Sequence, residues 1–510
     1  MVIGAALAWD DDVCEGVIIS FERGIYLVGS LRGGGCLWRG VRVGAADPSV
    51  TAVSGMSAVT ELCDRLGVVE ALDAAVGPIK RRDRGFSAGE LLVGLAAAQL
   101  AGEDFLVGLD RQRADVAGQV IAPVAGLSST TAAGLARRFT GRQWDEVESG
   151  VARVTARMLD RLPAAWQSWL TDTVTIDLDA SDVEVYGRKK RGVAYNHQGQ
   201  RCGRPHVASW AETETVLAAE LVSGNDDPRT SAPQLLRRAL RALPGQARAG
   251  RVRLRADAGY FAGELARVAL FEGIEFAIGA KRIAPLWRIL DGIAETDWAD
   301  AIDMTGAQVA VADYRPDWWP AKTCLLIRRV RLDISQVSAD PRSRRRRTLR
   351  PDQRSLPIAE LADADAIYGY SFICTNLDVS TPDKAVEAEY WYRHRTSIEN
   401  IFRDSKHGAA LRHLPSGYVE VNTAWMWGAL LAATMAGWLH QLTATEHPGG
   451  RLSGWGTRNG KAMIATLRHR LINIPARLVS HAGQQILRLP PGHVLLAEIL
   501  ARLRKLPAHP

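Results

Sequence analysis

The segment TVTIDLDAS, residues 173–181, decides the fold class, because the hydrophobic period of the chain changes there. Upstream, apolar residues recur at three- and four-residue intervals, which is typical of amphipathic helices. Within the segment, apolar and polar residues alternate, as on a β-strand with two different faces. The apolar face comprises Val174, Ile176 and Leu178, and the polar face comprises Thr175, Asp177 and Asp179. We therefore expect a strand that carries two carboxylates on one face.

A second segment, RVRLRADAGYF at 251–261, repeats this pattern and places Arg253, Arg255 and Asp257 on one face. Between the two, residues 206–224 predict two strands joined by a turn. After the second, AGELARVALFEG predicts a helix and IEFAIGA a strand. The order of strand, hairpin, long connection, strand, helix and strand is that of a mixed α/β layer.

The region before this layer predicts helices. Ser87 is followed three residues later by Glu90, which is a capping-box signature. Ser129 or Thr130 is expected to cap a later helix, whose end carries a cluster formed by Arg137, Arg138 and Arg142. Helices with a basic cluster fit a DNA-binding module and fit a plain helical bundle equally well.

Residues 285–370 interrupt the α/β pattern with strand-like segments and an arginine-rich stretch at 342–350. Such a charge run is usually a solvated loop, although it can also neutralise phosphates. The chain after 446 returns to helical patterns, including 460–484 and 493–506. The predicted division is 1–48 leader or flexible tail, 49–168 helical and DNA-binding, 169–284 core, 285–370 β-rich insertion with a basic arm, 371–445 core, and 446–510 helical.

Composition favours a globular protein with an anionic partner. The chain has 510 residues, of which 47% are hydrophobic, and a formal net charge of +7. Its six cysteines form no C-x-x-C pair, so we expect free thiols rather than a zinc or redox site. The apolar stretch 424–444 is too short for a membrane span and predicts a buried core helix. The N-terminal residues show no signal-peptide pattern, and we expect a cytoplasmic, nucleoid-associated protein without membrane contact.

The segment YWYRHRTSIENIFRDSKHG, residues 390–408, places a carboxylate, Glu399, among basic residues. If it forms one helix, four side chains share an arc of roughly 60°. They are Tyr392, Arg395, Glu399 and Lys406. A salt-bridge ladder would explain part of this pattern, but it would need neither the tyrosine nor the excess of cations. A site for a phosphodiester held by a cation would need all four.

Three carboxylates that converge from two strands and a helix would bind two hard cations through oxygen. Two such cations activate the attacking oxygen and stabilise the leaving oxygen of a phosphodiester. The expected ligands are Asp179, Asp257 and Glu399, with Asp177 in support, because alternation alone does not choose between Asp177 and Asp179. Each aspartate taken singly would also suit a loop-capping role.

These residues resemble the DDE transposases of bacterial insertion sequences, in the group marked by a Tyr-x2-Arg-x3-Glu-x6-Lys signature. Tyr392, Arg395, Glu399 and Lys406 match that signature without a gap, and TIDLDAS and LRADAGYF resemble the strands of the first and second Asp. The small residue and serine after Asp179 fit the family's first Asp. Other phrases are similar to the branch whose first motif begins Asp-x-Asp.

The resemblance implies a ribonuclease H-like core of mixed α/β class and cut-and-paste transposition with two Mg²⁺ ions, for which Mn²⁺ can substitute. It implies that Tyr392, Arg395 and Lys406 contact DNA phosphates. The partners would be double-stranded DNA, as terminal inverted repeats and target, bound by a dimer. In relatives an insertion tryptophan holds a flipped base. The candidates here are Trp298, Trp318 and Trp319.

Three alternatives stay open. The chain could be a metal-dependent nuclease on the same fold, a DNA-binding protein derived from a transposase that no longer cuts, or a scaffold without nucleic-acid function. No P-loop, His-Glu-x-x-His or Gly-x-Ser-x-Gly motif is present in the sequence, so we expect neither an ATP requirement nor a covalent protein–DNA intermediate.

Overall fold

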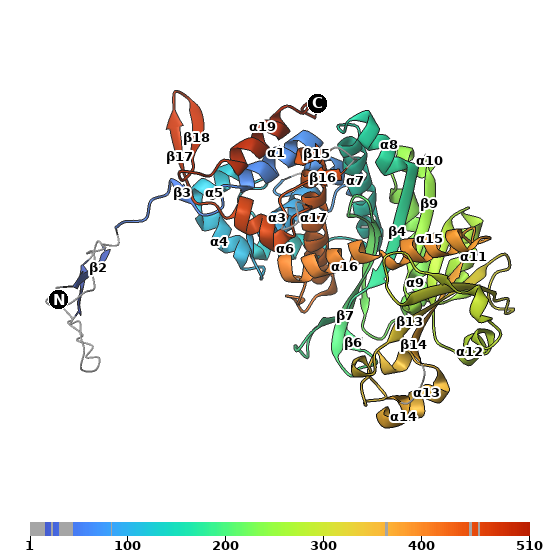
Figure 1. Cartoon of the computed structure of the whole chain (residues 1–510). Helices are drawn as coiled ribbons and strands as arrows, with labels where there is room; N and C mark the ends of the chain where they lie inside the picture. The colour runs from blue at the N-terminus through green and yellow to red at the C-terminus, as the bar shows by residue number, and fades with distance from the viewer. Residues whose placement is uncertain are drawn as a thin grey trace.

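A computed structural model describes residues 44–82, 84–362, 366–447, 451–456 and 460–509, together with the backbone of two short strands near the N-terminus. The described chain is a mixed α/β structure, which confirms the predicted class. A long mixed sheet occupies one side in Figure 1, and the helices of the two ends of the sequence gather on the other.

The centre of the sheet has the strand order β8-β7-β4-β9-β10. The strands β8, β7 and β4 are antiparallel neighbours, whereas β4, β9 and β10 are parallel. Their bounds are β4 Thr173–Ala180, β7 Arg201–Trp210, β8 Thr215–Ser223, β9 Arg251–Ala256 and β10 Glu275–Ala280. Because β4, β9 and β10 run the same way, the residues that follow them meet at one edge of the sheet.

The strands of the 285–370 region extend this same sheet. Strand β14 (Ile367–Thr375) pairs antiparallel with β10, and β13 (Cys324–Leu332), β12 (Ala307–Asp313) and β11 (Ala299–Asp300) follow outward. The predicted β-rich character of this segment is therefore present, but the segment is continuous with the core rather than a separate layer.

The arginine-rich stretch is folded, unlike the solvated loop that its charge suggested. Arg346 is only 3% exposed and donates hydrogen bonds to the backbone oxygens of Arg354 and Leu356. A small core packs beneath it, formed by Leu332, Val337, Leu349, Leu361 and Ile367. Burial of these apolar side chains fixes the backbone, so most of the arginines project from a defined surface.

Helices fill the N-terminal region as predicted. They are α1 Met56–Leu66, α2 Val68–Val76, α3 Ala88–Ala101, α4 Gly108–Ala114, α5 Val116–Ile121, α6 Ser129–Ala136, α7 Gly141–Leu159 and α8 Ala164–Asp172. The capping box of α3 is confirmed, since Ser87 and Glu90 exchange hydrogen bonds. The cap of α6 is Ser128, one residue before the predicted Ser129.

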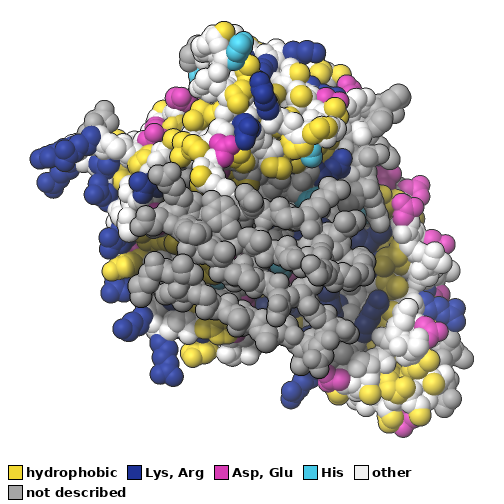
Figure 2. All heavy atoms as spheres, turned by 90° about the vertical axis from the view of Figure 1, so that its left-hand side faces the viewer, with side chains coloured by type: hydrophobic (Ala, Val, Ile, Leu, Met, Phe, Trp, Pro, Cys, Tyr) yellow, Lys and Arg dark blue, Asp and Glu magenta, His cyan; other side chains and the backbone are white. Residues whose placement is uncertain are grey.

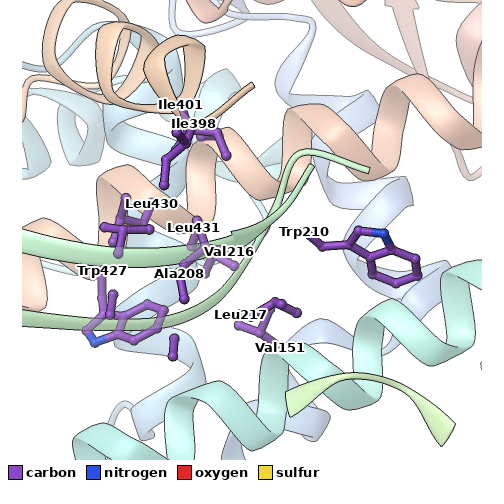
Figure 3. Close-up of a cluster of buried hydrophobic side chains, with 14 of the residues drawn as sticks. Val151, Ala208, Trp210, Val216, Leu217, Ile398, Ile401, Trp427, Leu430 and Leu431 are labelled. Atoms are coloured by element: carbon purple, nitrogen blue, oxygen red, sulfur yellow. The ribbon is translucent and has the colours of Figure 1, made fainter. Parts of the chain in front are cut away.

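The predicted buried helix is confirmed as α17, Val419–Thr443, and it is the centre of the helical region. Its tryptophans Trp425, Trp427 and Trp438 are all buried. It contacts α3 on one side and β8 on another, so it joins the helices to the sheet. Figure 3 shows this junction, in which Leu430 and Leu431 belong to one cluster of buried side chains with residues of β7, β8 and α7. Within the described ranges, no helix combines the length and hydropathy that a bilayer crossing requires.

The C-terminal helical prediction is wrong over residues 476–488. These residues form a hairpin of β17 (Ala476–His481) and β18 (Gln484–Arg488), which also pairs with β3 (Val50–Thr51). The turn residues Ala482 and Gly483 have φ values of 49° and 76°, which suit a two-residue hairpin turn. Helix returns at α18 Ile464–Leu467, at the π-helix Arg468–Ile472 and at α19 Leu495–Arg504.

Near the N-terminus, β1 (Gly16–Phe21) pairs antiparallel with β2 (Gly24–Gly29), a hairpin that the sequence did not predict. The rest of the predicted leader up to residue 43 lies outside the described residues. The four described cysteines, Cys63, Cys202, Cys324 and Cys374, are free thiols, as expected.

The half-buried histidine of α17 predicts how stability changes with pH. Burial and the Lys461 ammonium lower the pKa of His440 to about 4, and Glu214 acts in the opposite direction. In the unfolded chain the histidine titrates near its ordinary pKa of 6.5. His440 therefore contributes stability that is fully present above about pH 6.5 and is lost as the pH falls toward about 4.

When the pH is lowered from about 6.5 to about 4, we expect the melting temperature of His440→Gln to fall less than that of the wild type. Differential scanning fluorimetry across the range measures this, with the exposed His469→Gln as a control that should follow the wild type. Parallel curves for wild type and His440→Gln would contradict the assignment.

Candidate functional site

The polar faces of β4 and β9 lie side by side in register. Asp177 is paired with Arg255 and Leu178 with Ala256. Asp179 and Asp257 are the next residues of that face, at the adjoining ends of two parallel strands. The alternation seen in both sequence segments therefore brings these two carboxylates to one edge of the sheet.

Asp177 does not act in the way the sequence predicted. Its two oxygens lie 2.7 and 2.9 Å from Nε and Nη2 of Arg255, and the Ser397 hydroxyl donates to the second oxygen at 2.7 Å. The Asp177 side chain is completely buried. A carboxylate with this many partners is not free to hold a cation, so Asp177 belongs to a buried ion pair and not to the ligand set.

The segment 390–408 is helical, but it is not one helix. Helix α15 (Pro382–Arg393) ends where His394 and Arg395 adopt ψ values of 38° and 29°. Helix α16 (Thr396–Arg403) follows, and a π-helical turn runs over Asp404–Gly408. The single-helix arc is therefore not what brings the four signature residues together. They reach the same region because the break redirects the chain across the edge of the sheet.

Packing of α16 determines where Glu399 points. Ile398, Ile401 and Phe402 are buried, and Glu399 is exposed on the other side of the helix. Figure 3 shows Ile398 and Ile401 directed toward the buried cluster around Leu430 of α17. The apolar stripe thus fixes the rotation of α16 and turns the carboxylate outward.

The acids share one electrostatic environment. Burial raises the pKa of Asp179 to about 6, Arg395 opposes the rise, and Asp257 and Glu399 add to it. Carboxylates from β4, from the end of β9 and from α16 are therefore close enough to repel one another. Among the described residues, no three Asp, Glu, His or Cys side chains stand close enough to form a preformed metal site.

Hard divalent cations prefer carboxylate oxygens, and Asp179 and Asp257 lie at the adjoining ends of two paired strands, with Glu399 on the neighbouring helix α16. A cation would relieve the repulsion that contributes to the raised pKa of Asp179. The donor set of Asp179, Asp257 and Glu399 therefore fits a divalent metal by its chemistry.

Arg395 lies close to Asp179 and Asp257. Burial lowers its pKa, but Tyr392, Asp179 and Asp257 outweigh burial and raise it above the ordinary value. Within the described part of the chain, its Nε atom is buried and makes no hydrogen bond. A guanidinium in this state has a donor available for an additional anion.

Tyr392 is held by the end of β9, and Lys406 by the loop after β4. The Tyr392 hydroxyl donates to the backbone oxygen of Ala256 at 3.3 Å. A Cβ atom on Gly279 would stand 2.5 Å from that hydroxyl, so glycine is required there, a constraint that the sequence analysis missed. The Lys406 ammonium donates to the Ser181 hydroxyl at 2.6 Å and to the Asp182 backbone oxygen at 2.7 Å.

Tyr260 is a further residue that the sequence analysis did not select. It ends the 3-10 turn Ala258–Tyr260, which starts directly after Asp257. Burial raises its pKa, and the charges of Asp179 and Asp257 add to the rise. Its hydroxyl is buried without a hydrogen-bond partner among the described residues. The only sequence signal was its position, three residues after the second acid.

The three candidate stacking tryptophans differ in environment. Trp319 is 4% exposed and belongs to the core. Trp298 covers the guanidinium of Arg329, with 4.2 Å between the ring centroid and Cζ. Trp318 is 45% exposed and contacts Phe261 edge to face at 5.2 Å between ring centroids. Phe261 lies four residues after Asp257, so Trp318 is the exposed candidate joined to the loop of the second acid.

Comparisons with known proteins add to this geometry. No curated protein matches the chain. Among solved structures, a piggyBac transposase in a synaptic complex with hairpin DNA matches 75% of this chain and 75% of its own, with 10% identity and a TM-score of 0.33. The family model described as "Transposase DDE domain group 1" matches residues 38–339 and 358–508. The chain belongs to this family of DDE transposases.

Proposed function

We propose that this transposase performs cut-and-paste transposition, in which it cuts DNA at the ends of a mobile element and joins them to a target. The observation that carries the proposal is the in-register pairing of β4 with β9, which brings Asp179 and Asp257 to adjoining strand ends beside Arg395. Acids that can hold metal cations, beside a guanidinium that can hold a phosphate oxygen, suit chemistry on a phosphodiester, because the phosphodiester is negatively charged.

The fold supports this assignment. In the centre of the sheet, three antiparallel strands (β8, β7, β4) are followed by two strands parallel to β4 (β9, β10), with α11 (Gly263–Phe271) between the last two. We propose that this is a ribonuclease H-like core, which the signature group and its Asp-x-Asp branch would require. A bacterial insertion sequence is the proposed source.

Asp179, Asp257 and Glu399 would hold the divalent cations, which we propose to be two Mg²⁺ ions with Mn²⁺ as a substitute. When bound, these ions supply Lewis-acid activation of the attacking oxygen and stabilise charge on the leaving oxygen. Arg395 offers its unpaired Nε to a phosphate oxygen. Tyr392 and Lys406 keep the loops after β9 and β4 in place, and they line the path of the phosphate.

Surface charge supports DNA as the partner. The chain carries a net charge of +7, and Figure 2 shows Lys and Arg side chains projecting from the lower left margin of one face. We propose that the protein binds terminal inverted repeats and target DNA as a dimer, in the cytoplasm and on the nucleoid. Phosphate neutralisation would make this binding strongly dependent on salt.

The first test is cleavage. Labelled DNA carrying the terminal repeats that flank the gene is incubated with the protein in Mg²⁺, Mn²⁺ or EDTA. We expect nicking at the repeat end that depends on the cation and falls at least about 100-fold in Glu399→Gln and Asp257→Asn, because each loses a charge that stabilises the reaction. The matched control is Glu387→Gln, an exposed glutamate of α15 that should cut like the wild type.

Two outcomes would overturn the proposal. Nicking without joining of pre-cut ends to a target would indicate a nuclease on this fold. Equal binding by wild type and variants, with no cut in either cation, would indicate a DNA-binding protein derived from a transposase.

The second test measures the cation without catalysis. Mn²⁺ at tenfold its dissociation constant should stabilise the wild type by about 1.4 kcal/mol, and EDTA should reverse the effect. Asp179→Asn should lose the response, and without metal it should melt no lower than the wild type at neutral pH, because it removes one of the crowded charges. Thermal melting measures both the Mn²⁺ response and the stability without metal. The exposed Asp383→Asn is the control, and an equal Mn²⁺ shift in Asp179→Asn would refute the ligand set.

The third test concerns base stacking by Trp318. We expect Trp318→Ala to slow the attack of the freed 3′-hydroxyl on the opposite strand by about tenfold or more, while the first nick changes little. Trp318→Phe should keep most of the rate, because the ring remains. Gel analysis of hairpin and nicked products over time separates the two steps. Equal slowing of both steps by Trp318→Ala would argue against stacking.

A further inference from the structure

An exposed group of aromatic and basic side chains begins directly after the first catalytic strand. From β4 the chain enters the short strand β5 (Val183–Glu184), makes a loop, and returns in β6 (Ala194–Tyr195), which lies beside the lower end of β7 in Figure 1. The loop carries Tyr186, which is 86% exposed. It also carries Arg188, Lys189 and Arg191, all of which are exposed.

Backbone contacts hold this loop in a defined shape. The Arg201 guanidinium donates to the backbone oxygens of Gly187 and Lys190. The backbone N–H of Arg191 donates to the oxygen of Gly417 at 3.1 Å. The loop is therefore tied both to β7 and to the turn that precedes α17, and its charged side chains project from a fixed backbone.

The group continues onto the N-terminal helices through Tyr418. The ring of Tyr418 is flanked by two guanidinium groups, with Cζ of Arg137 at 4.9 Å and Cζ of Arg191 at 5.8 Å from its centroid. Arg137 caps the end of α6, and Tyr418 is 44% exposed. We call the whole set the tyrosine–arginine strip: Tyr186, Arg188, Lys189, Arg191, Tyr418 and Arg137.

In the part of the chain that the structure describes, the cations of the strip have no acidic partner. Within the described residues, none of Arg137, Arg188, Lys189 or Arg191 forms an ion pair, whereas the nearby Arg204 pairs with Asp182 at 2.6 Å. Fixed like charges repel one another, and a polyanion would relieve that repulsion. The ring of Tyr186 is open as well, since only its hydroxyl is engaged, by donation to Glu184 at 3.1 Å.

Lys406 connects the beginning of the strip's loop to the proposed catalytic residues. Lys406 of the signature donates to Ser181 and Asp182, the two residues that precede β5. The loop that carries the strip therefore starts within a few residues of Asp179, and Arg191 and Arg137 at the Tyr418 ring extend the strip to α6.

We propose that the tyrosine–arginine strip binds the DNA strand that leaves the catalytic acids, with its cations on the phosphates and Tyr186 stacked on an unpaired base. This rests on the proposed function and extends it, because none of these six residues belongs to the catalytic signature. Interleaved aromatic and basic side chains are the means by which proteins hold single-stranded nucleic acid.

The test compares two charge-matched double variants by fluorescence anisotropy, with Ca²⁺ present to prevent cutting. The strip variant is Arg188→Gln with Lys189→Gln. The control is Arg241→Gln with Arg248→Gln, two exposed arginines near the start of β9, at the opposite edge of the sheet. The probes are a blunt terminal-repeat duplex and the same duplex with an unpaired extension at the cleavage site.

The slope of log affinity against log salt should fall by about 1.4 for the strip variant on the extended probe, which is the loss of two contacts to a single strand. The control should keep the wild-type slope. Equal slopes for the strip variant and the control would overturn the proposal.

Stacking is tested with Tyr186→Ala and Tyr186→Phe. Tyr186→Ala should weaken binding of the extended probe by about tenfold or more and leave the blunt probe unchanged, while Tyr186→Phe retains affinity. An equal effect on both probes would refute the stacking role.

The binding experiment and the cleavage assay in Mg²⁺ together separate the strip from the catalytic proposal. If the wild type cuts DNA and the strip variant binds and cuts with wild-type salt dependence, the strip assignment fails and the transposase assignment stands. If the wild type never cuts but the strip variant loses its salt slope, the strip assignment stands and the catalytic assignment fails.

Discussion

The ion pair between Arg255 and Asp177 is the constraint on which the site depends. Arg255 binds both oxygens of Asp177 and donates its remaining Nη1 to the backbone oxygen of Trp391 at 2.7 Å. Ser397 donates to the same aspartate. One buried cluster thus joins β4, β9, the end of α15 and the start of α16. A buried ion pair gives little net stability. An arrangement of these elements that separated the two partners would leave an uncompensated buried charge, so the pair strongly disfavours other arrangements.

This cluster explains why the acids on either side of it are placed as they are. Asp179 and Asp257 follow the paired residues on their strands, so the register that forms the ion pair also brings the acids together. Glu399 is two residues after Ser397 on α16, and the burial of Ile398 turns it away from the core. The carboxylates are consequently held close despite their repulsion, which contributes to the raised pKa of Asp179. A bound cation would lower the repulsion between these carboxylates, so the arrangement favours cation binding.

The helical region contributes by supporting the sheet from one side. Helix α17 is buried along nearly its whole length, and it packs between α3 and β8. Arg238 of α9 (Pro228–Ala242) adds a polar connection, because it pairs with Glu148 of α7 and with Glu220 of β8. The N-terminal helices are therefore joined to the mixed sheet through both apolar and ionic contacts. DNA held across the tyrosine–arginine strip would touch both parts at once.

The sequence by itself determined the local features of this protein. Alternation predicted β4 and β9, the capping box predicted the start of α3, and the spacing of Tyr392, Arg395, Glu399 and Lys406 identified the signature, because each depends on neighbours within a few residues. Alternation could not distinguish Asp177 from Asp179, because both lie on one face. The family resemblance favoured Asp179, and only the partner strand shows that Arg255 pairs with Asp177. The sequence also missed the helix break at His394, the hairpin at 476–488 and the space that Gly279 leaves for Tyr392. Those features were decided by tertiary structure, because they arise from contacts between segments distant in sequence, which no local pattern encodes.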